Sequence, residues 1–243
     1  MDYEELNYNT LSREQQFEAS LAFPALMRKV YVWMTLALVI TGFTAYYVAT
    51  SPALITMIIT IITNKILLLG LMVAEVLLVL VISGAINKLS LPMATFLFAL
   101  YSVINGATMS LIFLAYTASS IASVFFITAG TFAVMAAYGY FTKKDLTSWG
   151  PILFMGLIGL ILASVVNIFI GNSFMDLIIS YAGVIVFVGL TAYDSQKIKN
   201  LLIQAPDASE GMQKLALLGS LSLYLDFINL FIYLLRIFGS RRD

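Results

Sequence analysis

Three carboxylates interrupt long apolar segments: Glu75 in GLMVAEVLLVL, Asp194 in GLTAYDSQKIK and Asp226 in SLSLYLDFINLFIYLLRIFG. A charge inside a bilayer costs several kcal/mol unless it is paired or hydrated, so such residues commonly serve ion or proton pathways. The chain has no cysteine and no histidine. Thiol chemistry, disulfides, His-based zinc sites and Ser-His-Asp hydrolysis are therefore excluded. Proton chemistry near neutral pH must use carboxylates.

Asp226 lies in the middle of the last apolar segment and belongs to a regular stripe. Six residues recur there at alternating intervals of three and four, the spacing of one helix face: Gly219, Ser222, Asp226, Asn229, Tyr233 and Arg236. The other faces are Leu, Ile and Phe. We therefore expect this helix to be central in a bundle, with its polar side toward protein or water. The alternative is a packing stripe in which Asp226 is protonated and simply hydrogen-bonded.

Asp194 ends the preceding apolar segment, and a short loop joins the two segments. They are expected to be antiparallel neighbours, so Asp194 and Asp226 form a candidate pair that shares a proton. Two carboxylates are also ligands that Ca²⁺ prefers. Asp194 alone can instead be an interfacial residue offset by Lys197 and Lys199. Because Asp194 lies near the inner boundary, contact requires a displaced last helix or a hydrated interior.

Glu75 lies in the second apolar segment, and two interpretations remain open. It is a pathway or ion-binding residue, together with Ser222 and Asn229 of the stripe, or a protonated carboxyl bonded to a neighbouring Asn or Ser. Asn105, by contrast, is expected to serve close helix packing among small residues.

The composition identifies the class of protein. Apolar residues make up 61% of 243 positions and charged residues 11%, whereas soluble domains carry about 25% charged residues. The net charge is zero, so nucleic acid is not an expected partner. The chain is therefore expected to be an all-α integral membrane protein surrounded by lipid, and not an enzyme. It offers no histidine for rhomboid-like proteolysis, and Lys214 is too close to a helix entrance for a retinal Schiff base.

The apolar segments predict seven transmembrane helices, since one crossing needs about 20 residues. They cover about 28–49, 66–87, two helices within 89–142 that turn at 116–120, then 146–175, 177–193 and 213–238. A short apolar connector follows the first. The predicted domains are a polar N-terminal arm (1–23), the membrane domain (24–239) and a polar tail (240–243). Ser12 and Gln15 resemble a capping box for a short surface helix that Pro24 separates from the first crossing.

Basic residues in the loops predict the orientation. With a cytoplasmic N-terminus, the inner side carries nine Lys and Arg residues and the outer side four. A re-entrant last segment would change the count to twelve against one. However, residues 213–238 are long enough to cross and contain a turn-forming glycine only at Gly219, inside the stripe. Seven crossings are therefore predicted.

Several motifs resemble the Bax inhibitor-one family, also called the transmembrane Bax inhibitor motif family. SLYLDFINLFIYLLRIFG is similar to its C-terminal signature, AYDSQKIK to its sixth-helix motif, FTKKDLTSWG to a loop and NGATMS to its third helix. The resemblance covers about residues 22–239 and suggests the bacterial branch. It implies seven helices around a central seventh, and a pH-sensitive Ca²⁺ leak.

The resemblance also implies roles for individual residues. The aspartate pair of the family falls on Asp194 and Asp226, and Glu75 matches a second-helix glutamate. Some bacterial relatives carry an arginine that latches onto the pair, where this chain offers only Lys88.

Two functions are carried forward from the sequence. The first is a pH-sensitive calcium leak channel of the bacterial inner membrane, gated by Asp194 and Asp226, with calcium as the transported or bound ion and no other cofactor. The alternative is a non-transporting regulator that binds a membrane-anchored ATP-dependent protease, with residues 1–23 as the contact.

Overall fold

The structure is a computed structural model that describes the chain from residue 13 to residue 242, with side chains from residue 21. Over that range the regular elements are helices: α2 (Arg13–Thr50), α3 (Pro52–Thr63), α4 (Lys65–Ala85), α5 (Leu91–Met109), α6 (Ile112–Ala115), α7 (Ala118–Phe141), α8 (Trp149–Ile170), α9 (Ser173–Leu202) and α10 (Glu210–Phe238). The predicted all-α class is confirmed.

Within residues 13–242, seven helices are long and apolar enough to cross a membrane: α2 from Leu21, α4, α5 extended by α6, α7, α8, α9 and α10. The prediction of seven crossings is confirmed. The last helix is continuous over 29 residues, or about 43 Å at 1.5 Å per residue. A hydrocarbon core of about 30 Å leaves no need for a re-entrant turn.

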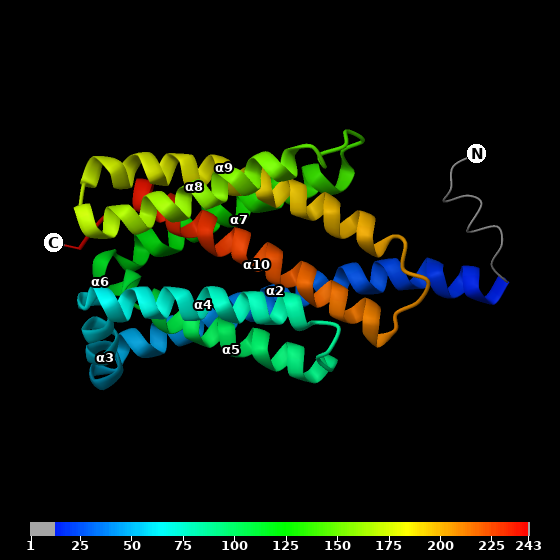
Figure 1. Ribbon diagram of the computed structural model, residues 1–243, viewed down its shortest axis with the longest axis horizontal. Coiled ribbons are helices and arrows are strands. Elements are labelled where there is room, and N and C mark those ends of the chain that lie inside the picture. The colour runs from blue at the N-terminus through cyan, green and yellow to red at the C-terminus, as the bar shows by residue number, and fades with distance from the viewer. Residues whose placement is uncertain (1–12, 243) are drawn as a thin grey trace.

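The loops lie at two opposite ends of the bundle (Figure 1). The amino end holds the start of α2 and the connections 86–90, 142–148 and 203–209. The carboxyl end holds α3, α6, the turn between α8 and α9, and the segment that follows α10.

Local capping explains where several helices begin. The side chain of Asn64 accepts from two backbone N–H groups at the start of α4, and Asn172 does the same for α9. The side chain of Thr117 accepts from the N–H of Ser120 and begins α7. Short polar side chains satisfy N–H groups that have no partner inside the helix. The turn predicted at 116–120 is confirmed, since Tyr116 and Thr117 connect α6 to α7.

Three elements differ from the sequence prediction. The helix α2 continues through Pro24, so no separate surface helix ends there; the predicted cap at Ser12 lies outside the described residues. The apolar connector is itself the helix α3, whose 12 residues are too few to cross. The helix α9 extends to Leu202, so Asp194 lies inside a helix rather than at its end.

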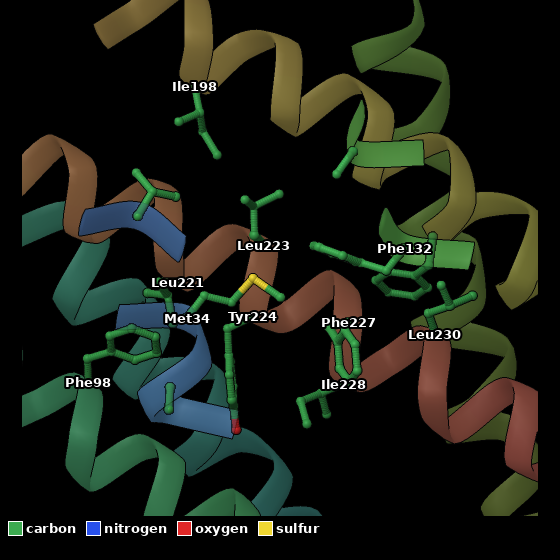
Figure 2. Packing of buried hydrophobic residues seen from close by; sticks show 14 of the residues in the cluster. Met34, Phe98, Phe132, Ile198, Leu221, Leu223, Tyr224, Phe227, Ile228 and Leu230 are labelled. Carbon is green, nitrogen blue, oxygen red and sulfur yellow. The ribbon is translucent and has the colours of Figure 1, made fainter. Parts of the chain in front are cut away.

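The last helix is the most buried of the seven. It runs between α8 and α9 on one side and α4 and α5 on the other (Figure 1), and it packs against α2, α5, α7 and α9. Figure 2 shows Leu223 of α10 pointing toward Ile198 of α9, while Tyr224 extends past Met34 toward the other side. By contrast, α4 and α8 are the least buried crossings, so their apolar side chains face lipid.

The helices α7 and α9 approach so closely that one position requires glycine. A Cβ atom added to Gly139 would overlap the backbone carbonyl of Ala192. One turn away, the hydroxyl of Ser195 donates to the carbonyl of Ala136 over 2.8 Å. Small residues and interhelical hydrogen bonds are the usual means of association in lipid. These contacts fix the part of α9 that carries Asp194.

We predict that Gly139→Ala lowers the thermal stability of the protein in detergent. A backbone carbonyl cannot rotate away as a side chain can, so the two helices must separate, at a cost of about 1–3 kcal/mol. Gly130→Ala is the matched control, because nothing lies within 4 Å of the added Cβ on the same helix. Equal unfolding temperatures for the two variants would contradict the packing described for α7 and α9.

Candidate functional site

Asp226 lies in the interior of the bundle, and one oxygen atom of its carboxyl group has no hydrogen-bond partner among the described residues. Its side chain is 4% exposed, and its Oδ2 atom is the buried side-chain oxygen without a hydrogen-bond partner among the described residues. A buried polar atom in this condition costs about 1–3 kcal/mol, and more if it is charged. The alternative interpretation, that Asp226 is simply hydrogen-bonded within a packing stripe, does not account for this oxygen.

Asp194 lies on α9, the helix that makes the most extensive contact with α10. Its side chain is partly buried. Lys197 follows one helical turn later, and its charge acts on Asp194. Lys199 points elsewhere, because its ammonium donates to the carbonyl of Tyr140 over 2.9 Å. The structure thus brings together the two predicted carboxylates and one lysine.

Two contacts give the register between α9 and α10. A Cβ atom on Gly219 would lie 3.0 Å from Ile198, and one on Gly183 would lie 2.5–2.7 Å from the ring of Tyr233. The helices are therefore antiparallel and the predicted stripe faces α9, as expected. Counting along both helices between these two contacts places Asp226 level with residues 190–191 of α9. Asp194 is therefore offset from Asp226 by about one turn, or about 5 Å along the helix axis.

Aromatic side chains fill the interior on the carboxyl-end side of the pair. The rings of Phe132 and Phe227 are 5.5 Å apart, and those of Phe187 and Tyr233 are 5.8 Å apart. Phe231, one turn beyond Phe227, is 5% exposed. The first pair packs edge to face, whereas the second is tilted, with an angle of 30° between the rings. These rings make the interior apolar between the carboxylates and the carboxyl end.

Ser222 and Asn229, the two stripe residues predicted to line the pathway or bind the ion, are partly buried. The amide nitrogen of Asn229 donates to the carbonyl of Leu225 over 2.8 Å, which leaves its side-chain oxygen as an available acceptor. Ser222 lies one turn from Asp226 on the side of the amino end. Both belong to the face of α10 that is turned to α9.

Glu75 is held apart from the aspartate pair. Its helix α4 packs on α3 and α5, and its carboxylate accepts from the hydroxyl of Thr108 over 2.8 Å. One of the two interpretations left open for Glu75 was a bond to a neighbouring Asn or Ser, and the partner in the structure is Thr108. The field of Glu75 acts on Tyr101 and Tyr224 rather than on the aspartates.

Lys88 does not reach the pair. It lies exposed in the turn between α4 and α5, and its ammonium makes no hydrogen bond or ion pair with any residue that the structure describes. Within residues 13–242, no group of three or more acidic, Cys or His side chains gathers to hold a metal. A Ca²⁺ ion at the pair would therefore combine Asp194 and Asp226 with neutral oxygens or water.

The sequence compares closely with a known family of membrane proteins. The family described as "Inhibitor of apoptosis-promoting Bax1" matches residues 24–243. The chain belongs to the Bax inhibitor-one family. An inner membrane protein of Escherichia coli, YbhL, is 51% identical over 218 residues, covering 89% of this chain and 92% of the relative. Uncharacterized proteins of Borreliella burgdorferi and Rickettsia prowazekii are 45% and 40% identical, covering 89% and 96% of this chain and 92% and 96% of each relative.

This Bax inhibitor-one family member carries a second polar cluster, which the sequence did not predict, on the opposite face of α10. The hydroxyl of Tyr224 lies 2.7 Å from that of Thr41 and 3.2 Å from the amide oxygen of Asn105, and its single proton is shared between these two acceptors. The hydroxyl of Thr41 donates to the carbonyl of Ser102 over 3.0 Å. Tyr224 is fully buried and extends toward α2 and α5 (Figure 2).

This tyrosine cluster joins α2, α5 and α10 through residues that had been assigned to packing or not singled out. One signal was available in the sequence. Tyrosine in membrane proteins concentrates at the bilayer interfaces, whereas Tyr224 lies in the middle of the last apolar segment. A mid-membrane tyrosine needs a hydrogen-bond partner from another helix.

We predict that Tyr224→Phe destabilises this family member by about 1–3 kcal/mol, because Asn105 and Thr41 lose a buried partner. Thermal unfolding in detergent measures the effect. Tyr101→Phe is the matched control: Tyr101 is also buried, at 5% exposure, and its hydroxyl makes no hydrogen bond with the described residues. If both variants unfold at the same temperature, the cluster does not stabilise the bundle.

Proposed function

We propose that the protein is a pH-sensitive calcium leak channel in which Asp194 and Asp226 share a proton and gate the flux. The observation that carries this proposal is the unpartnered Oδ2 atom of Asp226, buried on a helix that packs against α9, where Asp194 lies about one turn away. A membrane protein that needed only packing at this position would retain an apolar residue at lower cost.

A shared proton makes this pair a switch between two states. With one proton, only one of the two carboxyls is charged and the neighbouring helices remain together. Without a proton, two negative charges in a medium of low dielectric repel one another. The repulsion acts between α9 and α10, which form the most extensive helix contact of the bundle. Loss of the proton therefore favours separation of these two helices.

The chemistry of the polar face suits calcium. Hard oxygen ligands are available from Asp194 and Asp226, from the hydroxyl of Ser222, and from the side-chain oxygen of Asn229 that its own hydrogen bond leaves free. Glu75 lies on α4, apart from the aspartates, and its carboxylate accepts from the hydroxyl of Thr108. It is proposed as an auxiliary acidic residue of the channel. The aromatic layer of Phe187, Phe227 and Phe231 is the barrier that opening must displace.

We propose that the protein lies in the inner membrane with its amino end in the cytoplasm. Basic residues support this orientation, because the amino end carries nine Lys and Arg residues of the chain and the carboxyl end four: Lys65, Arg236, Arg241 and Arg242. A close relative is named as an inner membrane protein. A cysteine-labelling assay in intact cells tests the orientation directly.

We predict that Asp226→Asn abolishes the pH dependence of Ca²⁺ flux in proteoliposomes between about pH 5 and 8, where a coupled carboxylate pair can titrate. Asparagine has the shape of the protonated carboxyl and cannot ionise. The variant should therefore hold, at every pH, the flux that the wild-type protein reaches when the pair is protonated. Ca²⁺ uptake monitored with an entrapped fluorescent indicator measures this effect.

Asp207→Asn is the matched control. Hydrogen bonds from Ser209 hold the pKa of Asp207 below its usual range, so this loop carboxylate stays ionised throughout the interval and contributes no pH dependence. The gating role is wrong if the Asp226→Asn variant retains the wild-type pH profile.

The alternative function is a regulator that binds a membrane-anchored ATP-dependent protease. Its proposed contact is the arm 1–23, most of which lies outside the residues whose side chains the structure describes. Flux indistinguishable from that of empty liposomes at every pH would favour this alternative. Deletion of residues 2–20 should then abolish binding of the protease, whereas a channel should keep its flux.

A further inference from the structure

The segment Gly239–Arg242, directly after α10, is bound to the junction between α6 and α7. It runs antiparallel to that junction, with Arg241 opposite Tyr116. The N–H of Thr117 donates to the carbonyl of Ser240 over 3.2 Å, and the N–H of Arg242 donates to the carbonyl of Ala115 over 3.0 Å. This pairing joins positions more than 120 residues apart in the chain.

Side chains add further contacts to the same junction. The N–H of Ser240 donates to the hydroxyl of Ser120 over 2.9 Å, and the guanidinium of Arg242 donates to the carbonyl of Phe113 over 2.9 Å. A Cβ atom on Gly239 would lie 2.6 Å from the ring of Tyr116. Only a residue without a side chain allows the backbone to approach this ring.

No linker residues separate the end of α10 from the segment that binds the α6–α7 junction. The helix extends to Phe238, and the N–H of Gly239 still donates to the carbonyl of Leu235. The carboxyl end of α10 therefore cannot shift along its axis or swing outward while these bonds are intact.

The opposite end of α10 is tied down as well. Glu210 accepts from the N–H of Leu91 over 2.9 Å, and Lys214 donates to the carbonyl of Leu89 over 3.1 Å. Gln213 accepts from the ammonium of Lys29 over 2.6 Å. These contacts attach the amino end of α10 to α2 and to the turn before α5, so α10 moves relative to α9 only together with those elements.

We propose that Gly239–Arg242 is a latch that holds α10 in the closed arrangement, and that release of the latch increases ion flux. The proposal rests on the proposed channel function, because separation of Asp226 from Asp194 requires movement of α10. The bond from the N–H of Ser240 to the side chain of Ser120 and the bond from the guanidinium of Arg242 are both exposed, so water can replace them at low cost. The segment can therefore detach from the junction and bind again, whereas a buried contact would hold this end of α10 permanently.

Two adjacent arginines allow a matched test of the latch. Arg242 binds the junction through its guanidinium, whereas the guanidinium of Arg241 makes no hydrogen bond with the described residues. Arg242→Gln should raise Ca²⁺ flux at a fixed pH by about fivefold, the effect of one average hydrogen bond on an equilibrium. Arg241→Gln removes the same charge and should leave the flux unchanged. Equal flux in the two variants would overturn the latch.

A cross-link tests the same idea without loss of a charge. Thr117 and Ser240 are directly opposite in the antiparallel pairing, and the chain has no native cysteine. In the Thr117→Cys, Ser240→Cys variant, oxidation should form a disulfide and reduce the flux, and a reductant should restore it. The oxidised and reduced forms share the same substitutions, so only the covalent bond differs.

The outcomes separate the latch from the channel function. Failure of the disulfide to form, or equal flux before and after reduction, overturns the latch. If the disulfide forms and raises the unfolding temperature but wild-type liposomes carry no flux at any pH, the channel proposal fails. In that case the attachment of the segment stands, and its role in gating is rejected.

Discussion

The cost of a carboxyl group in a hydrocarbon environment governs the arrangement of this protein. Asp226 has an oxygen atom with no partner among the described residues, and its closest charged influence is another carboxylate. Such a group persists only where surrounding helices exclude it from lipid. The most buried helix carries it, the stripe around it faces α9, and close packing of α7 on α9 fixes the second carboxylate. These features follow from the need to shelter one ionisable group.

The last helix presents two polar faces with different energetics. On one face, the hydroxyl of Tyr224 is fully engaged with Thr41 and Asn105, and the cluster binds α10 to α2 and α5. On the other face, Asp226 lies against α9 without a satisfied hydrogen bond. A satisfied network holds its helices together, whereas an unsatisfied group gains from any rearrangement that supplies a partner. Movement is therefore favoured between α9 and α10, with α10 moving together with α2 and α5, to which the tyrosine cluster binds it.

Contacts at the two ends of α10 limit that movement. At the amino end, polar side chains of the helix bind the turn before α5 and the ammonium of Lys29. At the carboxyl end, the segment after Phe238 pairs with the α6–α7 junction. Between the two ends, aromatic rings fill the interior on one side of the aspartates. The central helix is therefore restrained at both ends, whereas Asp226 at its middle has an oxygen atom without a hydrogen-bond partner among the described residues.

The sequence by itself determined the seven crossings and most of the turns, and it singled out Asp194 and Asp226 as a candidate pair. These features depend on local information: the length of apolar runs, capping residues such as Asn64 and Asn172, and a helical period that puts Gly219, Asp226 and Tyr233 on one face. Hydropathy is a strong signal in a bilayer, because an unpaired backbone or charge has no water to bind.

Only the tertiary structure decided which partners those residues meet. Pro24 was expected to separate two helices, yet α2 continues through it, and the connector after α2 became α3. An Asn or Ser was one expected hydrogen-bond partner of Glu75, and the partner in the structure is Thr108. The tyrosine cluster joins residues as far apart in the chain as Thr41 and Tyr224. Each of these contacts links positions distant in the chain, and their energies depend on how whole helices pack. No local pattern contains that information, because a polar side chain within a span is compatible with several neighbours until the helices are in place.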